Sequence, residues 1–169
     1  MDKSNHSNVL IVGGGCAGVA VASRINNLKS DLTISIIEPS EKSLYQAAWT
    51  LVGAGAYNVN DTIKPMSSVM PSYVKWIKEY AEEFSPDSNS VKTNGGSYTY
   101  DYLVVCPGLK LNFDGVAGLK EHLGKNNVCT NYSAEMATYT WDCLKQLDGG
   151  TLLFTEPPMP IKCAGAPQK

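Results

Sequence analysis

The sequence predicts an α/β fold in which a parallel sheet carries an inserted antiparallel β-meander. The apolar run NVLIV at residues 8–12 leads through a glycine turn into a helical pattern at 17–28, and a strand pattern, DLTISIIEP, follows at 31–39. A strand, a helix and a second strand within about 30 residues form a βαβ unit, whose strands lie parallel in one sheet. The hairpin-rich section at 74–105 then predicts the meander.

The remaining elements are assigned from local patterns. In residues 40–72 the apolar residues recur with no sustained period. In 74–80 apolar and polar residues alternate as in a strand, although the charges of this segment also allow an amphipathic helix. The turn NGG at 94–96 predicts a hairpin that leads into a buried strand at 101–105. Ser133 is a plausible N-cap for a helix that runs to about Gln146, and TLLFT at 151–155 predicts one further buried strand.

Composition excludes several classes of function. The 169 residues carry a net charge of -2 with Arg24 as the only arginine, so a basic surface for nucleic acid or anionic lipid is not expected. The five cysteines show no CxxC spacing, which argues against a zinc site and favours a reduced, cytoplasmic setting. We therefore expect no metal and no nucleic-acid partner. A secretory signal is disfavoured because the segment before residue 9 has no net positive charge.

The glycine turn carries the clearest functional motif. Residues 13–18, GGGCAG, fit GxGxxG between a strand and a helix, and Glu38 ends the second strand. In a Rossmann-like fold the glycines allow a tight turn and close approach of a pyrophosphate to the helix N-terminus, and the acidic residue binds a ribose hydroxyl. Glu38 would repel a 2′-phosphate, which makes NADP unsuitable. The motif alone does not separate FAD from NAD.

A second motif lies near the C-terminus. Prolines fill the loop EPPMPIK, which leaves few N–H donors for a second pyrophosphate, and Cys163 follows at the expected start of a helix beside Lys162. Helix amides and a neighbouring cation both stabilise a thiolate, so Cys163 is a candidate nucleophile. The alternative is a small buried cysteine that only packs.

The blocks VLIVGGG, IIEPS, YQAAWTLVGAG, VKWIK, YDYLVV, NYS and KCAGAPQK resemble the sulfide:quinone oxidoreductases, a family of flavoproteins. Ala47 departs from the proline common in that family. The resemblance implies FAD as cofactor and Cys163 as one of two redox cysteines. Cys129 resembles an additional cysteine of some bacterial members, although an ordinary strand-end cysteine is an equal reading. The implied cofactor-binding residues are Gly13, Gly15, Cys16, Ala17, Gly18, Glu38, Gln46, the backbone of Ala81, and Gly108.

The resemblance also implies a reaction and an organisation. Sulfide is oxidised through a cysteine persulfide, and electrons pass through FAD to a quinone. Residues 1–125 are expected to form an incomplete FAD-binding domain and 126–169 the start of a second, nucleotide-type domain. Peripheral membrane association, at the mitochondrial inner membrane in a eukaryote, is expected only of a full-length protein. The alternatives are a truncated, inactive nucleotide-binding remnant and an NADH:quinone dehydrogenase-like flavoprotein.

Overall fold

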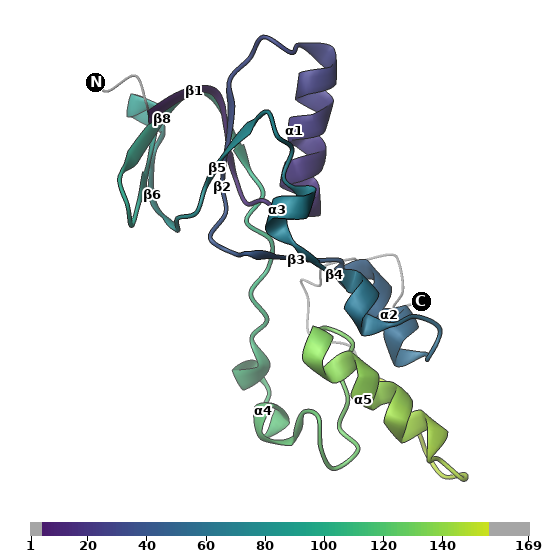
Figure 1. The fold of residues 1–169 in the computed structure, drawn as a ribbon. Helices are drawn as coiled ribbons and strands as arrows, with labels where there is room; N and C mark the ends of the chain where they lie inside the picture. Colours follow the sequence, from purple (N-terminus) through teal and green to yellow (C-terminus); the bar gives the residue numbers. More distant parts are fainter. Residues whose placement is uncertain (1–4, 156–169) are drawn as a thin grey trace.

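The computed structural model describes residues 5–155, which contain a mixed six-stranded sheet in the order β5-β2-β1-β8-β7-β6 (Figure 1). Four strands run parallel and two complete an antiparallel meander, which confirms the predicted fold class. The parallel strands are β1 (His6–Val12), β2 (Ile34–Ile37), β5 (Val74–Ile77) and β8 (Ser97–Val105), and the meander adds β6 (Ala81–Ser85) and β7 (Ser90–Thr93).

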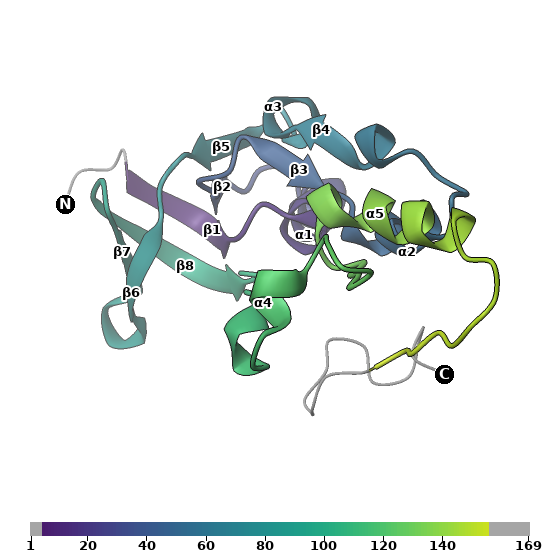
Figure 2. The same ribbon diagram turned by 90° about the horizontal axis from the view of Figure 1, so that it is seen from below.

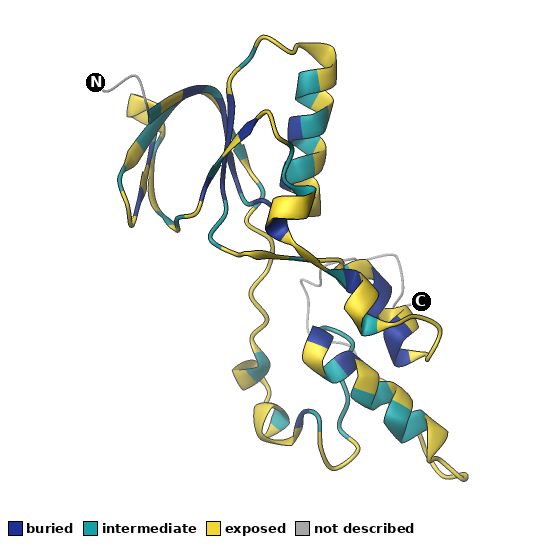
Figure 3. Ribbon diagram, in the orientation of Figure 1, coloured by how far each residue is buried: buried dark blue, intermediate teal, exposed yellow. Residues whose placement is uncertain are grey.

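The two faces of the parallel strands are covered by different elements. Helix α1 (Cys16–Leu28) packs its Ala22 against Val9 and Ile11 of β1 on one face. On the opposite face Leu10 of β1 packs with Val91 of the meander. Because both faces are covered, residues 9–12 of β1 are apolar without alternation, which is the pattern that identified this strand in the sequence, and β2 is buried at all four positions, Ser35 included. Figure 3 shows the buried residues concentrated along these central strands.

A second group of elements lies beyond the sheet (Figures 1 and 2). Helix α5 (Ala134–Lys145), predicted from the sequence, packs Ala134 and Ala137 against Trp49 and Val52 of α2 (Trp49–Gly53). Residues 40–72 also contain short elements that the sequence did not predict, because three to five residues are too few to show a period. They are the hairpin of β3 (Lys42–Leu44) and β4 (Ile63–Pro65), the 3₁₀ helices η2 (Gln46–Ala48) and η3 (Val59–Thr62), and helix α3 (Met66–Val69).

The connecting segments contain three further short helices. They are η4 (Pro86–Ser88) between β6 and β7, and η5 (Phe113–Gly115) and α4 (Leu119–His122) between β8 and α5. No helix within residues 5–155 has the length and apolar character needed to cross a membrane.

Two predictions of buried strands are wrong. Residues 151–155 have no strand structure, and Leu153 and Phe154 are 84% and 85% exposed, because this segment has no strand partner within the described part of the chain. Strand β8 forms as predicted, but Tyr102 is 70% exposed and Val105 is 52% exposed. The reason is that β7 pairs only with the first residues of β8, so the later ones pair with β1 alone.

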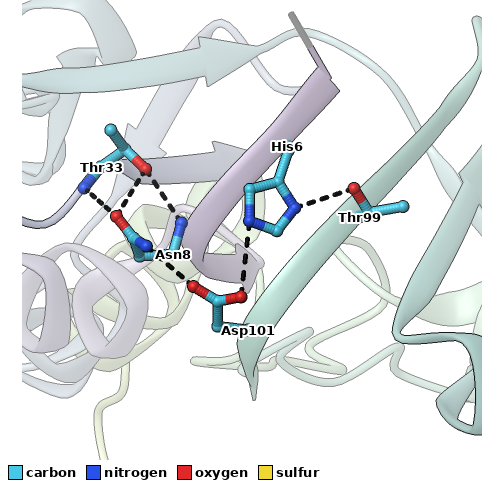
Figure 4. Close-up of polar contacts among 5 residues, drawn as sticks. All are labelled: His6, Asn8, Thr33, Thr99 and Asp101. Carbon is cyan, nitrogen blue, oxygen red and sulfur yellow. Dashed lines mark hydrogen bonds and ion pairs between the residues drawn. The ribbon is translucent and has the colours of Figure 1, made fainter. Parts of the chain in front are cut away.

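A polar network joins the amino ends of β1 and β8 to the segment before β2 (Figure 4). Asn8 is its centre: its Nδ2 donates to Asp101 at 2.8 Å, and its Oδ1 accepts from the Thr33 amide at 2.9 Å. His6 lies between Thr99, 3.0 Å from Nδ1, and Asp101, 3.4 Å from Nε2. Thr99, His6 and Asp101 are linked as the residues of a hydrolytic triad would be. They lie, however, at the end of the sheet opposite the glycine turn and connect the paired strands β1 and β8.

We expect Thr62→Val to destabilise the contact between α2 and η3. Thr62 is 1% exposed; its Oγ1 accepts from Trp49 Nε1 at 3.1 Å and donates to the Val59 carbonyl at 2.6 Å. Valine keeps the shape but removes this partner from the buried Trp49 indole and from the half-buried Val59 carbonyl, so the free energy of unfolding should fall by about 1–3 kcal/mol in urea denaturation followed by circular dichroism. The exposed hydroxyl of Ser68 also bonds a carbonyl, and Ser68→Ala serves as control. Equal losses in both variants would contradict the assignment.

Candidate nucleotide-binding site

The candidate site lies where three parallel strands end. Gly13 follows β1, Glu38 follows β2 and Cys106 follows β8. Main-chain hydrogen bonds hold these exits together: the Gly13 amide donates to the Ile37 carbonyl at 2.9 Å, and the Cys106 amide donates to the Val12 carbonyl at 2.7 Å. Ligands of open α/β sheets bind at this carboxyl edge.

Two of the predicted glycines are required by contact with the backbone. Gly13 has φ +102°, and a Cβ there would lie 2.0 Å from the Cys106 carbonyl oxygen. A Cβ on Gly18 would lie 1.9 Å from the Gly13 carbonyl oxygen and 3.3 Å from Ile11. No side chain fits at either position, so the first turn of α1 comes as close to β1 as backbone packing permits.

The outer rim of the turn is open. Gly15, Cys16 and Ala17 are exposed, and a Cβ on Gly15 would meet nothing within 4 Å. Gly15 is the N-cap of the 13-residue helix α1, which has no side-chain cap and no acidic residue in its first turn. The first amides of a helix have no intrahelical acceptor and carry the positive end of the helix dipole. This rim therefore fits an anionic group such as a pyrophosphate.

Glu38 is fixed at the side of this turn. One carboxylate oxygen accepts from the Gly14 amide at 2.8 Å and the other from the Ser40 amide at 2.7 Å. The carbonyl of Glu38 accepts from Trp76 Nε1 at 2.7 Å. Because a carboxylate has about four lone-pair positions, two acceptor positions stay available for the hydroxyls of a ribose.

Gly14 and Trp76 were not among the predicted site residues. A Cβ on Gly14 would lie 2.8 Å from the Cβ and Cγ of Glu38, so glycine lets the carboxylate reach the turn. The signal for Gly14 was present in the sequence, as the middle residue of three consecutive glycines. No sequence signal distinguished Trp76 from other strand residues.

The other predicted residues are distributed around this cluster. Gly108, with φ +74°, lies in the exposed segment after β8, and Ala81 is the half-buried first residue of β6. Gln46 begins η2 and half-buried Cys129 precedes α5, both in the group of elements beyond the sheet. Cys163 lies outside the described residues. Of the predicted residues, the contacts described above therefore bring together Gly13 and Gly18, which pack against each other, and Glu38, which bonds the intervening Gly14.

The cysteines that the structure describes are all free thiols. Cys16 is exposed, and Cys106, Cys129 and Cys143 are half-buried. Residues 5–155 contain no group of three or more His, Cys, Asp or Glu side chains arranged to hold a metal ion.

The sequence pattern of one protein family matches most of the chain. This is the pyridine nucleotide-disulphide oxidoreductase family, whose match extends over residues 7–137 and includes the glycine turn, Glu38 and the meander. The chain belongs to this family.

Sulfide:quinone oxidoreductases are among the relatives of this chain. The mitochondrial sulfide:quinone oxidoreductases of Dictyostelium discoideum and Mus musculus are 44% and 40% identical to it, each over 98% of this chain. The chain spans 37% of the length of these curated relatives. The crystal structure of the sulfide:quinone oxidoreductase from Aquifex aeolicus superposes with a TM-score of 0.65 at 32% identity, covering 83% of this chain and 32% of that one.

We expect Gly18→Ala to unfold the turn and Gly15→Ala to leave it folded. The new methyl group would overlap the Gly13 carbonyl in the first variant and meets open space in the second. The free energy of unfolding should fall by about 3 kcal/mol or more for Gly18→Ala and by less than about 1 kcal/mol for Gly15→Ala. Urea denaturation measures both, and similar losses would show that close helix packing does not determine the turn.

Proposed function

We propose that this chain supplies the FAD-binding part of a flavoprotein of the sulfide:quinone oxidoreductase type. The observation that carries the proposal is the open glycine turn with Glu38 fixed beside it, in a chain that resembles such enzymes over 98% of its length. Because the chain spans 37% of the length of those relatives, we assign to it FAD binding and one redox cysteine rather than the complete reaction.

The described residues suit the adenosine and pyrophosphate half of FAD. The exposed amides of Cys16 and Ala17 at the start of α1 would bind the pyrophosphate. Glu38 would accept the hydroxyls of the adenosine ribose with its remaining lone pairs. Gly108 would allow the segment after β8 to pass close to the pyrophosphate, and Gln46 and the backbone of Ala81 would contact the cofactor from η2 and β6.

The thiol chemistry is assigned to Cys163, with Cys129 as an additional cysteine. When bound, FAD supplies a two-electron acceptor. Sulfide would attack a disulfide between Cys163 and a second redox cysteine: the S–S bond that forms leaves a persulfide on Cys163, the S–S bond that breaks leaves a thiolate on the second cysteine, and two electrons pass from that thiolate to FAD. Lys162, next to Cys163 in the sequence, would stabilise the thiolate form of Cys163. A quinone is the proposed final acceptor, and a peripheral position at the mitochondrial inner membrane is proposed for the longer protein, since two similar relatives are mitochondrial.

We expect Glu38→Ala to weaken FAD binding by about 10- to 100-fold, because charge-assisted hydrogen bonds to the ribose are lost. Quenching of flavin fluorescence during titration measures the affinity. Glu82→Ala, on the exposed face of β6, is the matched control for loss of a carboxylate and should bind FAD as the parent does. Equal affinity in the parent and the Glu38 variant would remove Glu38 from the site, and absence of any binding by the parent would overturn the proposal.

We expect sulfide to decrease the flavin absorbance of the FAD-loaded chain and NADH to leave it unchanged. Cys163→Ser should remove the response to sulfide, whereas Cys106→Ser, which changes a half-buried thiol after β8, should keep it. Reduction by NADH alone would support a dehydrogenase in place of the proposed enzyme. Binding of FAD without response to either reductant would indicate an inactive nucleotide-binding remnant.

A further inference from the structure

Cys129 and Cys143, on either side of most of helix α5, both contact Asn127. The Cys129 Sγ donates to the main-chain carbonyl of Asn127 at 3.8 Å, and the Cys143 Sγ donates to its side-chain oxygen, also at 3.8 Å. Cys129 precedes α5 and Cys143 lies in its last turns. Both thiols are half-buried and neither forms a disulfide in the structure.

The backbone around Asn127 is held in an uncommon conformation. Asn126 and Asn127 both have left-handed φ values, +54° and +60°, which asparagine tolerates better than most residues. The Asn127 amide donates to the hydroxyl of Tyr139 at 3.1 Å. Tyr139 and Cys143 are four residues apart and therefore lie on one face of α5. The loop is thus fixed against the helix face that carries the second thiol.

Both thiols thus lie against the same asparagine, and the Cys143 side chain affects the pKa of Cys129. Burial, followed by a hydrogen bond with the Cys143 side chain, raises the pKa of the Cys129 thiol. At Tyr139 the hydrogen bond from the Asn127 amide lowers the pKa, but a hydrogen bond with the Cys143 side chain, burial and the charges of Cys143 and Cys129 together raise it above its usual value. Bond formation would require the two sulfur atoms, each now 3.8 Å from an oxygen of Asn127, to approach each other to about 2 Å.

We propose that Cys129 and Cys143 form a dithiol–disulfide couple that reacts with two-electron oxidants of the peroxide class. One thiol, as its thiolate, attacks hydrogen peroxide, which breaks the O–O bond and gives a sulfenic acid and one water. The second thiol then displaces the hydroxyl group as a second water. The balanced change is two thiols plus one peroxide giving one disulfide and two waters.

The disulfide would tie the loop before α5 to the end of that helix. The first turns of α5 pack on α2 through Ala134, Ala137, Trp49 and Val52. The oxidised pair would therefore restrain the packing of this helix pair. The couple shares Cys129 with the thiol chemistry of the proposed function, but its own test uses peroxide and thiol chemistry alone and needs neither FAD nor sulfide, so failure of one proposal can be told from failure of the other.

Peptide mapping of the full chain tests the couple. Trypsin cuts after Lys125 and Lys145 and releases both cysteines in one peptide, residues 126–145, and a second protease that cuts after Glu135 separates them. After peroxide treatment of the folded chain we expect this peptide to lose two hydrogen atoms and to resist alkylation at both positions. The two halves should stay joined until a reductant is added.

The matched variants are Cys129→Ser and Cys143→Ser, each of which should remove the joined product, and Cys16→Ser, which should retain it. The parent chain should form the product about tenfold faster when folded than in urea, because the fold holds the thiols together. Equal rates in the two states, or a peptide whose cysteines both stay open to alkylation while other thiols are oxidised, would overturn the couple. Pairing of Cys129 or Cys143 with another cysteine would also overturn it.

Discussion

The close approach of helix α1 to the end of β1 is the contact on which the proposed site depends. The backbone of Gly18 contacts the backbone of Gly13, and Gly13 in turn contacts the Cys106 carbonyl, with no space for a side chain at either glycine. This packing directs the first amides of α1 outward at the carboxyl edge of the sheet. If the helix lay farther from the strand, the positive end of its dipole would not be held at a fixed position beside Glu38.

Glu38 connects that turn to the rest of the sheet. Its carboxylate bonds the Gly14 amide, its carbonyl bonds Trp76 of β5, and its own amide donates to the Ile77 carbonyl at 2.9 Å. Three adjacent strand ends are therefore linked through one residue. A ligand hydroxyl bound to this carboxylate would be held by a side chain whose position is already determined by the protein, which reduces the entropy lost on binding.

The sequence was informative where a local rule determines structure. The turn of glycines, the acidic residue at the end of β2 and the uninterrupted apolar run of β1 each express a steric or solvation requirement, and all formed as predicted. The short elements of residues 40–72 were not predicted and residues 151–155 were wrongly predicted as a strand, because their structure depends on tertiary partners rather than on periodicity. The meeting of Cys129 and Cys143 at Asn127 depends on the loop conformation, which no spacing of cysteines encodes.

The carboxyl half of β8, which has a strand partner on one side only within residues 5–155, and the exposed apolar side chains at 152–154 also affect how this chain behaves in solution. A strand edge with free main-chain donors and acceptors is a template for strands of other molecules, and Tyr102 and Val105 make this one apolar as well. Self-association should thus compete with folding as concentration rises, and the carboxyl half of β8 is a third edge at which it can begin, beside the outer edges of β5 and β6.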